Sequence, residues 1–155
     1  MKKSEQILVI HGPNLNLLGK REKSIYGKTS LSEINDEIKK VAKAEKVSVD
    51  FYQSNHEGEI VTKIQEADDL YDAILINPAA FTHTSVAIRD AVASINIPVV
   101  EVHLSNIHAR ESFRKESFVS PVAAGVIFGF GKDSYFLGLR GIVSLLRGKR
   151  KSAHV

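Results

Sequence analysis

The sequence predicts a single α/β domain built on a parallel β-sheet with helices on both faces. Three observations support this: short β-branched runs alternate with helical patterns, no linker or low-complexity stretch interrupts them, and 155 residues is the length of one ordinary domain. Five such runs favour a flavodoxin-like three-layer sandwich with strand order 2-1-3-4-5. We assign residues 1–155 to this one domain and expect loose ends at 1–6 and about 148–155.

The expected strands are short apolar runs bounded by turn residues, which is the pattern of buried parallel strands. In chain order they cover residues 7–10, 47–51, 73–76, 99–104 and 122–128. Apolar residues at helical spacing predict helices within 31–42, 60–67, 82–94 and 135–146. Ser30 and Glu33 have the spacing of a capping box at the start of the first helix.

This topology predicts where a ligand binds. In an open parallel sheet, ligands bind beyond the carboxyl ends of the strands, near the point where strand order reverses. Here that point lies between the first and third strands, with the fourth strand alongside. Residues 12–29, 77–85 and 101–120 follow these three strands and hold most of the chain's unusual polar residues.

Composition excludes several classes of site. The chain has no cysteine, so disulfide scaffolds, iron–sulfur clusters, cysteine-bearing zinc fingers and thiol nucleophiles are excluded. No apolar run approaches about 18 residues, the minimum for a membrane-spanning helix. Residues 1–6 are too polar and too short for a signal peptide. We therefore expect a cytoplasmic protein with no membrane partner.

The net charge of +3 depends on a basic stretch near the C-terminus, formed by Arg147, Lys149, Arg150 and Lys151. Without these four, the 21 basic residues fall to 17, against 18 acidic residues. The body of the domain is therefore nearly neutral. We interpret the basic stretch as a solvated chain end and expect no nucleic-acid partner.

Three partial motifs fail on spacing. Gly27-Lys28-Thr29 matches the end of a phosphate-binding loop, but Glu22 occupies the position that requires the earlier glycine. Gly129-Phe130-Gly131 follows the last predicted strand and lacks the third glycine of a dinucleotide site. His103 and His108 are five residues apart, unlike the i, i+4 pair of a zinc-binding helix. The sequence therefore predicts no metal site.

The most unusual feature is a Glu-x-His pair on the fourth predicted strand. Residues two apart on a strand share a face, so Glu101 and His103 can point the same way and form a hydrogen bond. A carboxylate partner keeps a histidine charged and oriented, which suits a general acid. A fully buried strand gains no stability from such a pair, so we interpret it as functional.

The neighbouring loops supply further candidates. Residues 20–27 contain Arg21 and Tyr26 and are long enough to close over the strand ends as a lid, although in isolation a solvated arginine and a packed tyrosine explain them better. His83 suits a ligand contact or an ordinary place beside a helix cap. Arg110 and Arg114, one helical turn apart, can present two guanidinium groups to a carboxylate or to hydroxyls.

At these residues the sequence resembles a known family, the type II 3-dehydroquinate dehydratases of the shikimate pathway. The likeness runs from Ile7 to about Leu146. The motifs that carry it are GPNLNLLG (12–19), REKSIYG (21–27), THTSVAIRDA (82–91), EVHLSNIHAR (101–110) and FR (113–114).

The resemblance implies a hydro-lyase that converts 3-dehydroquinate to 3-dehydroshikimate by anti elimination through an enolate, without metal or cofactor. Tyr26 would be the base that removes a proton from C2, and Arg21 the cation that sustains it. His103, supported by Glu101, would protonate the departing hydroxyl. Asn14 would hold a water against the enolate oxygen.

The resemblance also implies how the substrate is bound. Asn77 and the backbone amides of Leu104 and Ser105 would bind its carboxylate. His83 and Arg114 would hold its ring hydroxyls.

A homo-oligomer is implied as well, with trimers assembled into a dodecamer. Asp90 would reach the site of a neighbouring subunit. Ala79 stands where many family members have glycine, which draws attention to the backbone of that loop.

The implied base requires a large pKa shift. A tyrosine with an ordinary pKa of about 10 is about 0.1% ionised at pH 7, and lowering its pKa to 7 requires about 4 kcal/mol of phenolate stabilisation. A guanidinium about 4 Å away supplies about that much at an effective dielectric constant of 20. Burial without the cation raises the pKa, so Arg21 decides whether Tyr26 can act.

Two other classes of function compete with this one. The first is a non-catalytic flavodoxin-like domain that binds an anion at the same edge of the sheet, and the Glu101–His103 pair disfavours it. The second is a nucleic-acid-binding protein that uses the basic C-terminal stretch. The nearly neutral body of the domain disfavours that alternative.

Overall fold

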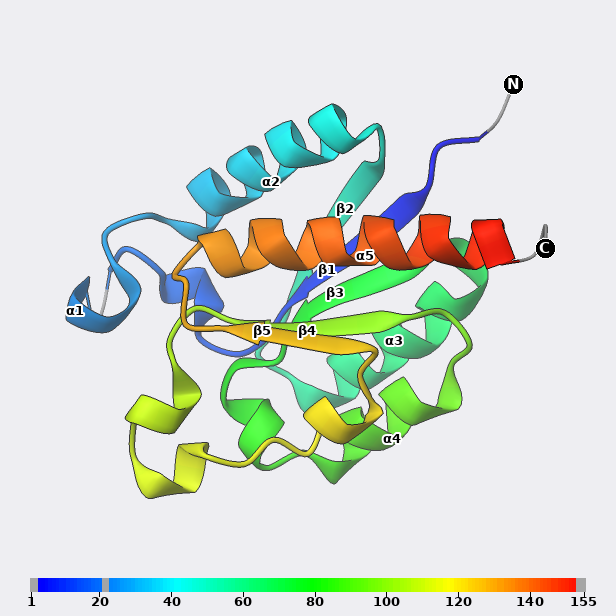
Figure 1. Cartoon of the computed structure of the whole chain (residues 1–155). Coiled ribbons are helices and arrows are strands. Elements are labelled where there is room, and N and C mark those ends of the chain that lie inside the picture. The colour runs from blue at the N-terminus through cyan, green and yellow to red at the C-terminus, as the bar shows by residue number, and fades with distance from the viewer. Residues whose placement is uncertain (1–2, 21–22, 153–155) are drawn as a thin grey trace.

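The computed structural model describes residues 3–20 and 23–152. These residues form one parallel sheet of five strands in the order β2-β1-β3-β4-β5, which confirms the predicted fold class (Figure 1). The strands are β1 (Gln6–His11), β2 (Ser48–Gln53), β3 (Ala73–Asn77), β4 (Val99–His103) and β5 (Gly125–Phe128). The helices are α1 (Lys23–Tyr26), α2 (Leu31–Glu45), α3 (Glu57–Leu70), α4 (Val86–Ser94) and α5 (Asp133–Ser152).

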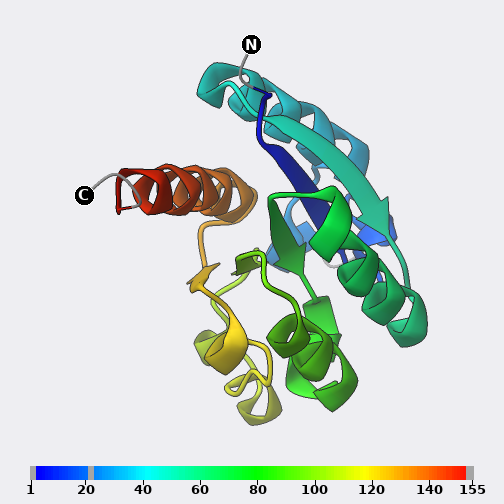
Figure 2. The same cartoon turned by 90° about the vertical axis from the view of Figure 1, so that its right-hand side faces the viewer.

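The helices cover both faces of the sheet (Figure 2). Side chains alternate between the two faces along each strand, so β1 contributes Ile7 and Val9 to one core and Leu8 and Ile10 to the other. The first core packs against α2 and α5, and the second against α3 and α4. Burial on both faces explains why these strands read as continuous apolar runs in the sequence.

The predicted helix over 82–94 is two elements in the structure. A 3-10 helix (Ala79–His83) comes first, and α4 starts only after Ser85. The Ser85 N–H donates to the Phe81 carbonyl oxygen at 2.8 Å, while its hydroxyl accepts from the Ile88 N–H at 2.9 Å. Ser85 therefore closes one turn and caps the next helix. The capping box of Ser30 and Glu33 on α2 is confirmed.

The fifth strand is shorter than predicted. Residues Ser120–Val122 form a 3-10 helix with a proline in its first residues, so β5 begins only at Gly125. The N–H groups of Val122 and Ala123 donate to the Val119 carbonyl oxygen at 3.0 and 3.1 Å, so this turn uses them and the strand starts later.

Two elements extend further than the sequence predicts. Gln6 belongs to β1, and α5 continues past its predicted end at 146 to Ser152. Arg147 donates a 2.6 Å hydrogen bond to the carbonyl oxygen of Glu45, which ties the last turns of α5 to the end of α2. No helix in the described part of the chain is both long and apolar enough to cross a membrane.

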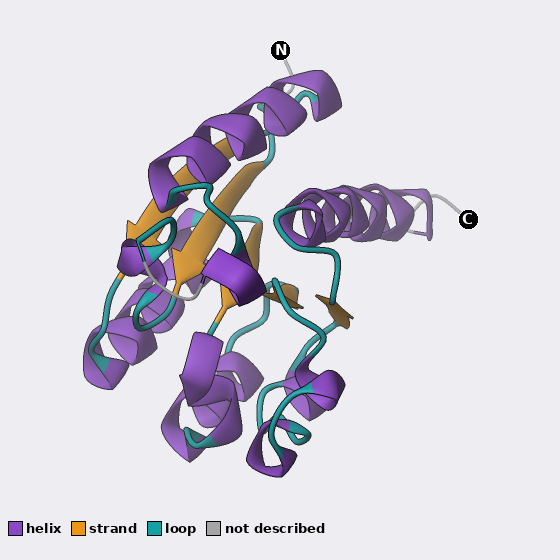
Figure 3. Ribbon diagram, turned by 90° about the vertical axis from the view of Figure 1, so that its left-hand side faces the viewer, coloured by secondary structure: helices purple, strands orange, loops and turns teal. Residues whose placement is uncertain are grey.

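The loop after β1 approaches the end of β3 very closely. The Gly12 N–H donates to the Asn77 carbonyl oxygen at 2.8 Å. A Cβ at position 12 would lie 2.4 Å from the carbonyl oxygen of Pro78, closer than any real contact. Only glycine therefore allows these two loops to meet at the carboxyl edge of the sheet, which faces the viewer in Figure 3.

Candidate active site

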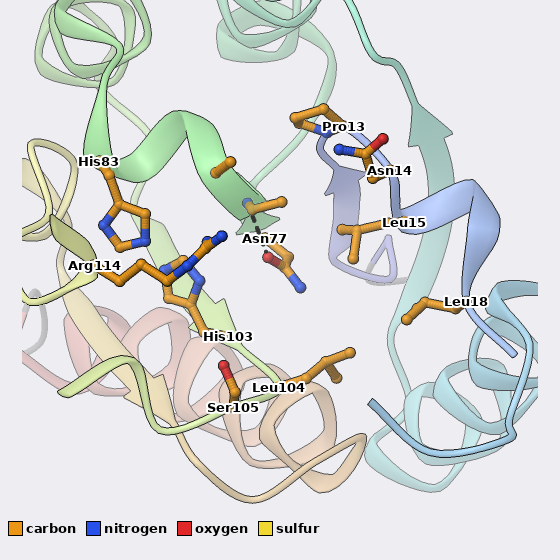
Figure 4. Close-up of a pocket in the computed structure, with 12 residues that line it drawn as sticks. Pro13, Asn14, Leu15, Leu18, Asn77, His83, His103, Leu104, Ser105 and Arg114 are labelled. Atoms are coloured by element: carbon orange, nitrogen blue, oxygen red, sulfur yellow. Dashed lines mark hydrogen bonds between the residues drawn. The ribbon is translucent and has the colours of Figure 1, made fainter. Parts of the chain in front are cut away.

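A pocket opens beyond the carboxyl ends of β1, β3 and β4, where the topology predicts a ligand site (Figure 4). It is partly enclosed and lined by both apolar and polar residues, as small-molecule sites are. The lining residues are Pro13, Asn14, Leu15, Leu18, Asn77, Ala79, Ala80, His83, His103, Leu104, Ser105 and Arg114.

The loop after β1 brings Asn14 into the pocket. Asn14 has a φ of 68°, a left-handed conformation that asparagine tolerates better than most residues. Its N–H donates to Oδ1 of Asn55 at 3.0 Å, and its carbonyl oxygen accepts from the Leu17 N–H at 3.0 Å. The backbone is therefore held on both sides of the side chain that lines the pocket.

Asn77 ends β3 and holds the loop that follows it. Its Oδ1 accepts from the Ala79 N–H at 3.1 Å, and its Nδ2 donates to the Tyr135 hydroxyl at 3.1 Å. Ala79 has a φ of 52°, a left-handed conformation that costs a residue with a Cβ about 1–2 kcal/mol. This backbone explains why the resemblance leads one to expect glycine at position 79.

The predicted Glu101–His103 pair lies on β4, which is buried at every residue. Nε2 of His103 lies 3.5 Å from Oε1 of Glu101, so the two side chains point the same way and form a close ion-pair contact. Among the described residues, none makes a hydrogen bond of normal geometry with Nε2. His103 also lines the pocket, so its ring lies within reach of a molecule bound there.

Three hydroxyl groups hold the Glu101 carboxylate. Those of Thr82, Ser117 and Ser120 lie 3.0, 2.7 and 3.0 Å from Oε1. Burial on its own would raise the pKa of Glu101, but the interaction with His103 and the hydroxyl hydrogen bonds outweigh it, so the pKa lies below its ordinary value. Glu101 is therefore ionised at neutral pH and can stabilise a protonated His103.

His83 and Arg114 complete the polar wall of the pocket. Nδ1 of His83 donates to the Glu116 carbonyl oxygen at 2.6 Å, and its ring centroid lies 6.4 Å from that of His103. Burial lowers the pKa of His83, and the charges of His103 and Arg114 act in the same direction. His83 is therefore neutral at pH 7, and its Nε2 can accept a hydrogen bond from a hydroxyl. Nε of Arg114 lies 2.8 Å from Oε2 of Glu111.

The sequence model of one protein family, Dehydroquinase class II, matches residues 5–143 of the chain. The chain belongs to this family. Among its relatives, the 3-dehydroquinate dehydratase of Acaryochloris marina is 57% identical over 141 residues, covering 91% of this chain and 95% of the relative. The 3-dehydroquinate dehydratase of Brucella abortus is 53% identical over 149 residues, covering 96% of this chain and 95% of the relative. The crystal structure of the type II dehydroquinase from Butyrivibrio crossotus matches with a TM-score of 0.88 at 48% identity, covering 90% of this chain and 97% of that one.

The class II dehydroquinase fold gathers most of the predicted site residues around one pocket. Glu101 is fully buried behind His103 and does not line the pocket itself. The predicted residues that line it are Asn14, Asn77, His83, His103, Leu104, Ser105 and Arg114.

The remaining candidates lie elsewhere. Arg110 follows a 3-10 helix (Ile107–Ala109) and Arg114 ends another (Ser112–Arg114), so the expected single helical turn is absent from this described segment. Arg110 does not line the pocket, but its Nε lies 3.8 Å from Oε2 of Glu111, the atom that Nε of Arg114 also contacts, so the two guanidinium groups meet at one carboxylate of this chain. Asp90 lies on α4 with a side chain that is 66% exposed.

The predicted lid falls partly outside what the structure describes. Arg21 lies outside the described residues. The backbone of Tyr26 belongs to α1, but its side chain is also outside the described part of the molecule. The roles of both residues therefore stay predictions.

The sequence did not reveal the residues that hold Glu101 and Asn77 in place. It singled out neither the three hydroxyl groups that hold Glu101 nor the buried Tyr135 that contacts Asn77. The hydroxyl residues do lie in the segments 77–85 and 101–120 that follow β3 and β4, so their position was a usable signal. Tyr135 offered none, because it lies on α5, far along the chain.

Proposed function

We propose that the chain dehydrates 3-dehydroquinate to 3-dehydroshikimate by anti elimination of water through an enolate. The observation that carries this proposal is the buried Glu101–His103 pair, whose imidazole lines a pocket for a small molecule. Relatives that share more than half of the sequence carry the name 3-dehydroquinate dehydratase, which identifies the substrate and the hydro-lyase reaction. In that role the chain acts in the shikimate pathway and in the cytoplasm.

The elimination needs a base on one side of the substrate ring and an acid on the other. Tyr26, sustained by Arg21, takes the C2 proton, and the electron pair moves into the carbonyl to form the enolate. Asn14 holds a water against the enolate oxygen. The enolate collapses as the C1–O bond breaks, and His103 donates the proton that lets the hydroxyl leave as water. Glu101 stays ionised throughout and stabilises the charged imidazole.

The polar wall suits the substrate's other groups. Asn77 and the backbone amides of Leu104 and Ser105 bind the carboxylate. Arg114 and the neutral His83 bind the ring hydroxyls, with His83 accepting through Nε2. Leu15 and Leu18 line the same pocket and keep water away from the ring.

A direct test is to mix the purified protein with 3-dehydroquinate and to follow the ultraviolet absorbance of the conjugated enone product. We expect this absorbance to rise steadily, at a rate proportional to the protein concentration. A non-catalytic anion-binding domain would instead bind the substrate, detectable by calorimetry, without any change in absorbance. That result would contradict the proposed activity.

We further propose that the chain forms trimers, which assemble into a homo-dodecamer, and that Asp90 completes the site of a neighbouring subunit. The exposed position of Asp90 on α4, outside its own pocket, supports this. Loss of a charged hydrogen bond at a substrate site lowers affinity by about tenfold or more, so Asp90→Ala should raise KM by about that much or weaken assembly. Asp36→Ala is the matched control, because Asp36 is equally exposed (65%) and pairs with Lys39 on α2. Sedimentation and steady-state kinetics measure both effects, and a fully active monomer would contradict the shared site.

A further inference from the structure

A chain of four polar side chains leads from α2 to the pocket. Nε2 of His11 lies 2.8 Å from Oδ1 of Asn35, and its Nδ1 lies 2.8 Å from the Tyr135 hydroxyl. That hydroxyl accepts from Nδ2 of Asn77 at 3.1 Å. His11 and Tyr135 are fully buried, and Asn77 is 3% exposed. The proposed chemistry uses only the last member of this chain.

The direction of every hydrogen bond follows from the end at Asn77. The Ala79 N–H is a donor, so the atom that it meets on Asn77 must be the amide oxygen, as the dashed line in Figure 4 shows. The amide nitrogen of Asn77 therefore faces Tyr135. Since an amide nitrogen only donates, the Tyr135 oxygen accepts, and its own proton is free for Nδ1 of His11.

The end at Asn35 leads to the same arrangement. Oδ1 of Asn35 only accepts, so Nε2 of His11 carries the proton between them. Burial lowers the pKa of His11 to about 4, so its ring is neutral at pH 7 and Nδ1 is an acceptor. Nδ1 can then accept a hydrogen bond from the Tyr135 hydroxyl, which stays protonated because burial raises the pKa of Tyr135. Asn35 and Asn77, at the two ends of the chain, therefore require the same direction of hydrogen bonding.

We infer that Tyr135 and His11 are positioning residues that hold the Asn77 amide so that its second N–H faces the pocket. One N–H of Nδ2 is used by Tyr135, and the other is left for an acceptor on the bound molecule. This inference rests on the proposed function, in which Asn77 binds the substrate carboxylate. The opposite orientation of the amide would direct its oxygen at that carboxylate and its nitrogen at the Ala79 N–H.

The decisive variant is Tyr135→Phe, which keeps the ring and removes the hydroxyl. Asn77 then loses the partner that fixes its nitrogen, and we expect KM for 3-dehydroquinate to rise by about tenfold while kcat changes by less than about threefold. Tyr71→Phe is the matched control. Its hydroxyl also makes a 2.8 Å hydrogen bond, to Asp50, but Tyr71 lies just before β3, at the opposite end of the strand from Asn77.

A double-mutant cycle separates positioning from general loss of stability. In an Asn77→Ala background, Tyr135→Phe should raise KM by less than about twofold, because its effect passes through the missing amide. An equal, additive rise in both backgrounds would overturn the inference, and so would an unchanged KM in the single variant. If the wild-type protein itself fails to dehydrate 3-dehydroquinate, the proposed function fails instead, and the two failures are thus distinguishable.

A second variant tests the same direction of hydrogen bonding if Tyr135→Phe does not fold. Asn35→Asp changes no packed volume and places a carboxylate beside Nε2 of His11, which raises the pKa of His11. The protonated ring donates from Nδ1 as well, so Tyr135 loses its acceptor. The other groups packed around the ring are Tyr135 and Phe51, with Lys39 over the Phe51 ring.

We expect KM of Asn35→Asp to rise as pH falls through the new His11 pKa, in a step that the wild-type protein lacks. Nuclear magnetic resonance of the imidazole locates that pKa independently. A His11 that titrates in the accessible range with no accompanying change in KM would overturn the inference.

Discussion

His103→Ala is expected to lower kcat for dehydration by about a thousandfold or more, because a positioned general acid contributes roughly 10²–10⁴-fold. Without the imidazole, the C1 hydroxyl must leave as hydroxide. Slow exchange of the C2 proton with deuterated solvent should persist, since the proposed base is a different residue. Absorbance measures the first effect, and mass spectrometry of recovered substrate measures the second.

The fold should survive this change, because Thr82, Ser117 and Ser120 still hold the Glu101 carboxylate. His108→Ala is the matched control. His108 follows the same strand and contacts the Phe128 ring, but it does not line the pocket. Retained dehydration in His103→Ala would assign the acid to another residue.

Tyr26→Phe is expected to abolish both dehydration and C2 proton exchange, with a loss of about 10³-fold or more, since Tyr26 is the proposed base for the C2 proton. Arg21→Ala should also lower turnover by orders of magnitude, because an unassisted phenol stays protonated at neutral pH. Deuterium exchange distinguishes these variants from His103→Ala, which keeps the exchange step.

Tyr52→Phe is the control for Tyr26→Phe, because the Tyr52 hydroxyl makes a 3.4 Å hydrogen bond to Glu59 and Tyr52 does not line the pocket. Circular dichroism should show the same fold for all these proteins. Normal activity in Arg21→Ala, or proton exchange that continues in Tyr26→Phe, would contradict the proposed base.

Much of the site could be predicted because it follows from local pattern. The alternation of side chains along a strand places Glu101 and His103 on one face whatever surrounds them. The parallel topology places the loops after β1, β3 and β4 at one edge of the sheet. Asn14, His83 and Arg114 were found in this way, helped by motifs that resemble those of a known family.

The predictions that the structure changes concern segments in which the backbone turns within a few residues. Arg110 was expected one helical turn from Arg114, but two short 3-10 helices occupy that segment, and the two guanidinium groups meet at Glu111 instead of in the pocket. Ser85 divides a predicted helix in two. Such turns depend on single hydrogen bonds, which periodicity does not register.

The amino-acid sequence alone determined the fold class, the strand order, the edge of the sheet that binds a ligand and the Glu-x-His pair, because each depends on spacing along the chain. The tertiary structure decided what holds these groups in place. The hydroxyls around Glu101 and the chain from Asn35 to Asn77 each join segments that lie apart in the sequence. Their hydrogen bonds exist only once packing has removed water from between those segments, and packing is a property of the whole fold.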